Sequence, residues 1–109
     1  ASSNGHLDLV QVLLENGANS DHEDKEGRTP LVVASINGHL EIARLLLEYN
    51  ANKEHQDKEG KAPLLVASMN GHLEIVQLLL ECGAEMGRQD WEGRTPLFVA
   101  SSNGHLETV

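Results

Sequence analysis

The phrases NGHLDLV (residues 4–10), NGHLEIA (37–43), NGHLEIV (70–76) and NGHLETV (103–109) recur with a spacing of 33 residues. A second phrase keeps the same spacing, as DKEGRTPL at 24–31, DKEGKAPL at 57–64 and DWEGRTPL at 90–97. Self-similarity at one fixed period is typical of a stack of equivalent units and not of a globule around one central core.

The chain of 109 residues is predicted to be a single repeat array, 1–109, which the period divides into units. Two units are complete, at 24–56 and 57–89, and partial units occupy 1–23 and 90–109. Aromatic residues make up only 3% of the chain, which favours a thin core of small aliphatic side chains between neighbouring layers. Because the chain starts and stops inside a unit, we expect a fragment of a longer array.

The first half of each unit predicts a turn followed by a short helix. Asp24 and Gly27 hold the first and fourth positions of a type I β-turn. Thr29 is a helix N-cap and Pro30 suits the first helical position, where its missing N–H has no cost. The helix is expected to run to about residue 37, where Gly38 ends it in the left-handed conformation.

The second half of each unit predicts a longer amphipathic helix, at about 40–49 in the first complete unit. Its apolar residues recur at i, i+3 and i+4. Gly17, Asn50 and Gly83 occupy the slot that ends this helix, and all tolerate positive φ. Residues 51–56 are expected to be extended and to close a hairpin-like loop. Each unit is therefore predicted as turn, helix, tight loop, helix and loop.

The phrases GRTPL, NGHLEI, LLLE and NGA at this period resemble the ankyrin repeat across the whole chain. The resemblance implies an all-α fold, an ankyrin-type α-solenoid of stacked helix-turn-helix repeats joined by β-hairpin-like loops. It also implies a non-catalytic scaffold that binds a protein or peptide partner on the concave face made by the turn tips and first helices.

Two departures from the family pattern affect the first helices. The family usually has His two residues after Pro, whereas this chain has Val32, Leu65 and Phe98, so apolar packing replaces a polar link. The unit 57–89 has Ala62 in the N-cap slot. Loss of such a cap destabilises by roughly 1 kcal/mol, so this unit is expected to have the weakest helix start and to stay folded because both neighbours cover it.

The resemblance places the partner-binding residues on the turn tips and on the exposed edge of the first helix. Trp91 is the most distinctive of them, because it replaces Lys in a slot that needs no indole, and Trp is enriched in binding hot spots. Drift in a terminal unit would explain it equally well. The full set comprises Lys25, Glu26, Arg28, Ile36, Asn37, Lys58, Glu59, Lys61, Met69, Asn70, Trp91, Glu92, Arg94 and Ser102.

The sequence offers little for catalysis, metal or cofactor binding. The histidines repeat in fixed slots (His6, His39, His72 and His105; His22 and His55), where repeats about 8–10 Å apart place them too far apart to share a zinc ion. We expect the first four to hydrogen-bond around the Gly turn and the start of the second helix. Cys82 has no repeated base beside it, and the carboxylates do not converge. No enzyme activity, metal or cofactor is predicted.

The formal net charge of −9 resides mostly on the second helices, where Arg44 is the only basic residue against seven acidic ones. This acidity fits a solvated face or an attraction for a basic partner, and it disfavours nucleic acid. No stretch approaches the ~20 apolar residues that span a bilayer, so no membrane partner is expected. One cysteine cannot form an internal disulfide, which fits an intracellular, cytoplasmic location.

A structural or assembly role is the alternative. Units of identical design without recognisable caps could associate end to end through their uncovered apolar faces, a heterologous contact that builds filaments.

Overall fold

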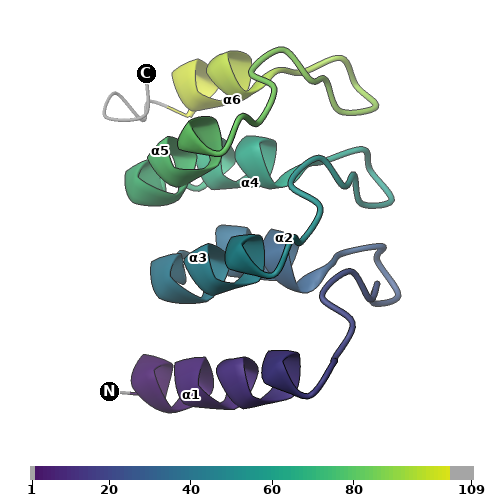
Figure 1. Ribbon diagram of the computed structural model, residues 1–109. Helices are drawn as coiled ribbons and strands as arrows, with labels where there is room; N and C mark the ends of the chain where they lie inside the picture. Colours follow the sequence, from purple (N-terminus) through teal and green to yellow (C-terminus); the bar gives the residue numbers. More distant parts are fainter. Residues whose placement is uncertain (1, 104–109) are drawn as a thin grey trace.

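The computed structural model describes residues 2–103, with the backbone alone for residues 2–6. The helices are α1 (Ser2–Glu15), α2 (Pro30–Asn37), α3 (Leu40–Glu48), α4 (Pro63–Met69), α5 (Leu73–Glu81) and α6 (Pro96–Ser102). No strand occurs within residues 2–103. The helices lie in successive layers with the long loops between units on one side, so the predicted all-α solenoid is confirmed (Figure 1).

The helices pack in two rows joined within each unit. α2 pairs with α3, and α4 pairs with α5; the shorter first helices α2, α4 and α6 stack on one another, and the second helices α1, α3 and α5 do the same. The core lies between these layers. It includes Leu31, Leu46, Leu64, Ile75 and Leu79, each at most 3% exposed. Neighbouring units therefore bury each other's aliphatic side chains, as in other repeat arrays.

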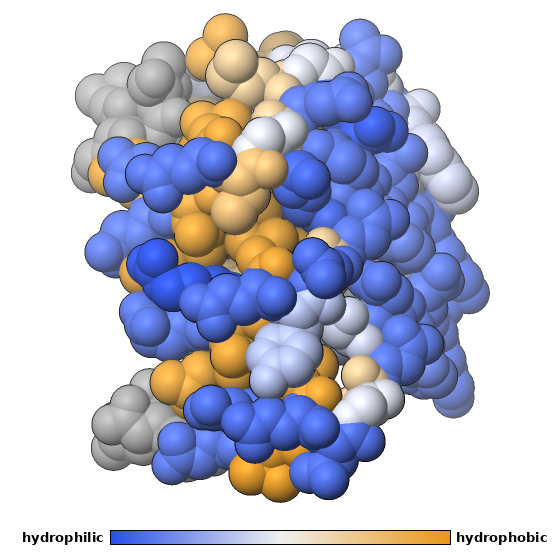
Figure 2. All heavy atoms as spheres, viewed as in Figure 1, coloured by the Kyte–Doolittle hydropathy of each residue, from blue (hydrophilic) through white to orange (hydrophobic). Residues whose placement is uncertain are grey.

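Apolar residues in Figure 2 gather over the helices in patches separated by hydrophilic rows, whereas the loop side is largely hydrophilic. The middle first helix is the most deeply covered, because α2 and α6 pack on its two sides. Leu64 and Leu65 are 3% and 2% exposed there, while their equivalents Leu97 and Phe98 in α6 are 60% and 54% exposed. Thus the apolar packing predicted for this slot occurs at Val32 and Leu65 but not at Phe98.

The N-caps follow the sequence. Thr29 accepts a hydrogen bond at its Oγ1 from the Val32 amide, and Thr95 accepts one from the Phe98 amide. Ala62 occupies the same extended backbone without a side-chain cap, and α4 forms nevertheless. The predicted loss of the cap is confirmed.

The predicted helix stops are confirmed as well. Gly38 has φ 77° and Asn50 has φ 65°, both in the left-handed region. The amides that follow close each helix, since His39 donates to the Ala34 carbonyl and Ala51 to the Leu46 carbonyl, each at 3.0 Å. Gly17 and Gly83 adopt φ 87° and 90° in the equivalent slots.

The predicted division of every unit into helix, tight loop and helix is wrong for the first unit. α1 is a single helix through Gly5, the counterpart of Gly38. Gly38 is held in its turn between α2, α3 and the His72 ring of the next unit. No separate first helix pairs with α1 in the described residues, so the helical hydrogen bonds simply continue. The fourth such glycine, Gly104, lies outside the described residues. No described helix is long and apolar enough to cross a membrane.

Candidate interaction surface

The turn tips are the segments 24–28, 57–61 and 90–94, and each is organised by the side chain of the Asp at its start. Asp24 Oδ1 accepts hydrogen bonds from the amides of Glu26 (2.8 Å) and Arg28 (2.9 Å), and its carbonyl accepts from the Gly27 amide at 3.0 Å. Asp57 and Asp90 repeat this arrangement. The predicted β-turn is therefore present in each tip, with the next residues of the turn left exposed.

The outer two tips add an arginine to the Asp carboxylate. The Arg28 amide and guanidinium hold the pKa of Asp24 below its ordinary value, with Nε 3.0 Å from Oδ2. Burial alone would raise the pKa of Asp90, but the backbone N–H and the guanidinium of Arg94, whose Nε lies 2.8 Å from Oδ2, lower it overall. Both tips are thereby charge-neutralised at their centre.

The middle tip differs because Lys61 replaces the arginine. Lys61 places its Nζ 2.7 Å from Glu59 Oε1, and this hydrogen bond lowers the pKa of Glu59. Asp57, 8% exposed, makes no ion pair with any residue between 2 and 103 and receives its two amide hydrogen bonds at Oδ1. One exchange of Arg for Lys thus leaves this carboxylate without a cation.

Adjacent tips are joined through the backbone. The Lys58 amide donates to the Glu26 carbonyl at 3.0 Å, and the Trp91 amide donates to the Glu59 carbonyl at 3.1 Å. His55 adds a hydrogen bond from Nε2 to the Gly27 carbonyl at 2.8 Å. The row of tips is consequently a single connected ladder.

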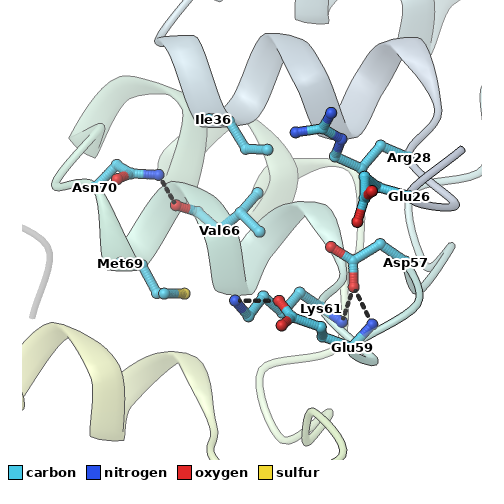
Figure 3. A pocket seen from close by; sticks show the side chains of 9 residues that line it. All are labelled: Glu26, Arg28, Ile36, Asp57, Glu59, Lys61, Val66, Met69 and Asn70. Carbon is cyan, nitrogen blue, oxygen red and sulfur yellow. Dashed lines mark hydrogen bonds and ion pairs between the residues drawn. The ribbon is translucent and has the colours of Figure 1, made fainter. Parts of the chain in front are cut away.

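A hollow of about 220 Å³ opens where the first two tips meet α2 and α4 (Figure 3). Seven of its lining residues were predicted as partner-binding: Glu26, Arg28, Ile36, Glu59, Lys61, Met69 and Asn70. Asp57 and Val66 also line it and were missed. The sequence assigns Asp57 only to the building of the turn. The sequence signal that could have singled out Asp57 is the Lys at position 61, where the equivalent positions 28 and 94 have Arg.

The other predicted residues lie outside this hollow. All are exposed except Arg94, which is half-buried: Lys25, Asn37, Lys58, Trp91, Glu92, Arg94 and Ser102. The Trp91 side chain is 70% exposed and lies over Gly60, where a Cβ would come 2.7 Å from Trp91 Cγ. The indole therefore covers the preceding tip and still offers most of its surface to solvent.

The histidine slot has a different role from the predicted one. His72 donates from Nε2 to the Ile36 carbonyl at 3.0 Å, so it links two units and does not brace its own turn. His39 makes no side-chain hydrogen bond within residues 2–103. The side chains of His6 and His105 lie outside the described residues. No group of three or more His, Cys, Asp or Glu among the described residues could hold a metal ion.

The family comparison covers the whole chain. The family model described as "Ankyrin repeats (3 copies)" matches residues 1–90 and, in an overlapping match, 53–109. A comparison with curated proteins gives no match. Ankyrin repeats are generally protein–protein interaction modules. On its sequence match, its stacked helix pairs and its ladder of turn tips, the chain belongs to the ankyrin repeat family.

Proposed function

We propose that this chain is a non-catalytic scaffold that binds a protein or peptide on the face made by its turn tips and first helices. The observation that carries the proposal is the hollow between the first two tips. It combines an apolar floor with a charged rim on elements fixed by hydrogen bonds.

The chemistry of the hollow suits side chains of a partner better than a substrate or a cofactor. Its volume of about 220 Å³ is below the roughly 300–1,000 Å³ of typical small-molecule sites. Asp57 and Lys61 are engaged in building the tip. Groups held in that way favour recognition over proton transfer, which supports the assignment as a non-enzyme without metal or cofactor.

The proposed contact surface extends beyond the hollow along the ladder. Trp91 would add a large exposed indole at one end, where aromatic residues often anchor interfaces. The units 24–56 and 57–89, flanked by 1–23 and 90–109, are our proposed modules of this surface. The complete set is Lys25, Glu26, Arg28, Ile36, Asn37, Lys58, Glu59, Lys61, Met69, Asn70, Trp91, Glu92, Arg94 and Ser102.

Amide chemical-shift mapping of the labelled chain with a binder selected from a displayed protein library tests this function. We expect the shifts to gather at the tips and along α2 and α4, and Ile36→Ser or Trp91→Ala to weaken binding. Gln77→Ala, an exposed change on α5, is the matched control. Shifts confined to α3 and α5, with loss of binding only in the control, would contradict the proposed face.

We also propose an intracellular location, without nucleic-acid or membrane partners. Cys82 is the single cysteine and is exposed, which suits a reducing compartment. Microscopy of a tagged chain checks this location, and secretion into the medium would contradict it.

End-to-end assembly is the second candidate function. It is favoured by apolar side chains exposed at both ends of the row of first helices: Val33 (36%) on α2, and Leu97 (60%) and Phe98 (54%) on α6. Joining such ends would bury them in a heterologous contact. Sedimentation velocity over a wide concentration range tests it. A growing series of oligomers that Phe98→Asp abolishes would support assembly, and a constant monomer mass would exclude it.

A further inference from the structure

We propose that the hollow between the first two tips recognises a basic and apolar segment of a protein partner. A lysine or arginine side chain of that segment lies between Glu26 and Asp57, and a neighbouring aliphatic side chain lies between Ile36 and Met69. This inference rests on the proposed function and adds the chemistry of the partner.

Two carboxylates of the hollow lack a cation. Glu26 is exposed, and its side chain forms no ion pair with residues 2–103. Asp57 is 8% exposed and likewise unpaired with any described cation. Figure 3 shows the Glu26 carboxylate directed toward Asp57 at the edge of the hollow, while Asp57 Oδ1 points to the amides of its own tip. Two unneutralised carboxylates on facing tips favour an ammonium or guanidinium group between them.

The cations that line the hollow are already engaged. Lys61 Nζ lies 2.7 Å from Glu59 Oε1. Arg28 also lines the hollow, and its Nε lies 3.0 Å from Asp24 Oδ2. Each has an acidic partner, so neither balances Glu26 or Asp57. The hollow therefore carries a net negative charge, and a partner has to supply the positive charge that balances it.

The apolar part of the hollow lies beside these carboxylates. Val66, 3% exposed, forms the floor, and the half-buried Ile36 and Met69 rise on either side of it (Figure 3). Burying an aliphatic side chain here gains roughly 25 cal/mol for each Å² removed from water. The last unit has Ser102 in the slot of these two residues, so the apolar pair belongs to α2 and α4 and is absent from α6.

Charge beyond the hollow favours the same partner. The chain carries a formal net charge of −9, which attracts basic segments at long range and raises their rate of association. A phosphate-rich or acidic segment would instead meet two bare carboxylates. The partner that fits both the hollow and the whole chain is a Lys- or Arg-containing segment with an adjacent Leu, Ile or Met.

The test uses a library of immobilised synthetic hexapeptides in which two adjacent positions are varied, probed with the labelled chain. We expect enrichment of Lys or Arg next to Leu, Ile or Met. In fluorescence anisotropy, Glu26→Gln should weaken binding of an enriched peptide by roughly tenfold or more and flatten its dependence on NaCl. Glu81→Gln, the same change at an exposed residue of α5, should leave the affinity unchanged.

A charge exchange separates recognition from any effect on folding. Glu26→Lys should prefer the peptide in which the basic residue is replaced by Glu, which damage to the fold could not produce. If the enriched peptides were acidic or uncharged and Ile36→Ser abolished their binding, this inference would be overturned. The proposed binding face would still stand. If Gln77→Ala abolished binding of the enriched peptides and Ile36→Ser did not, both this inference and the proposed binding face would be overturned. No enrichment of any class would overturn the inference alone, because folded partners could still use the face.

Discussion

Restoring the missing N-cap by Ala62→Thr should stabilise the array. Ala62 has φ −86° and ψ 166°, almost the same backbone as Thr29 at φ −89° and ψ 168°. Thr29 is 1% exposed in a similarly buried slot, where Ala62 is 4% exposed, so the surroundings accept the larger side chain. The new hydroxyl would accept a hydrogen bond from the Leu65 amide, as the Thr29 hydroxyl accepts one from the Val32 amide.

The expected gain is about 1 kcal/mol in the free energy of unfolding, within the 0.5–2 range of N-cap exchanges. For a domain of roughly 100 residues this corresponds to a rise in Tm of about 4–8 °C. The reverse change, Thr29→Ala, should lower the free energy of unfolding by a similar amount. The two sites lie in different units, so the double variant should return close to the parent value.

Urea denaturation followed by circular dichroism measures these changes, and amide hydrogen exchange at Leu65 localises them. Ala62→Val is the matched control, because it adds the same bulk as threonine without the hydroxyl. If valine stabilises as much as threonine, packing and not capping limits this helix start. If Thr29→Ala destabilises while Ala62→Thr has no effect, the assumed equivalence of the two slots is refuted.

Three further perturbations test the tips and the links between units. Gly60→Ala should lower the free energy of unfolding by more than the ~1–2 kcal/mol of left-handed backbone strain, because its φ is 81° and the new Cβ would meet Trp91; urea denaturation measures this. His72→Ala should lower it by about 1 kcal/mol, since the hydrogen bond to the Ile36 carbonyl is lost. Acid should lower Tm in thermal scans. The folded pKa of Asp90 is depressed below its ordinary 3.8, so its stabilisation is present above that pH and disappears as pH falls through the folded pKa.

Each of these has a counterpart within the chain. Gly93 has the same φ of 81° with nothing within 4 Å of a new Cβ, so Gly93→Ala should cost only the strain. Equal effects at Gly60 and Gly93 would rule out the indole contact. His39→Ala should change little, because that side chain is exposed and makes no described hydrogen bond. Asp90→Asn should reduce the loss of stability in acid, and an unchanged acid profile would exclude Asp90 as its source.

The turns, caps and helix stops could be predicted because each depends on a few adjacent residues. Asp24 and Gly27 form the hydrogen bonds of their own turn, and Gly38, which has no Cβ, adopts its φ of 77° without steric cost. The missing cap at Ala62 follows from the same local chemistry. Recurrence of these signals at one period then fixed the stacked arrangement of the helices.

Features that depend on contacts between units could not be predicted from these local signals. His72 reaches the carbonyl of Ile36 in the preceding unit, a partner that the pattern within one unit does not indicate. The continuous helix through Gly5 shows the converse, since a glycine ends a helix only where its surroundings favour the turn. Local sequence therefore predicted conformation well and cross-unit partners poorly.

The hollow follows from a departure from the repeat and not from the repeat itself. Lys61 does not form the ion pair that the guanidinium of Arg28 or Arg94 forms with the Asp of its own tip. It pairs with Glu59 instead, and Asp57 is left facing the hollow without a cation. Repeated residues build the same tip in every unit, so they cannot distinguish one segment of a partner from another. Specificity in such an array has to come from the positions where the units differ, and position 61 of the middle tip is one of them.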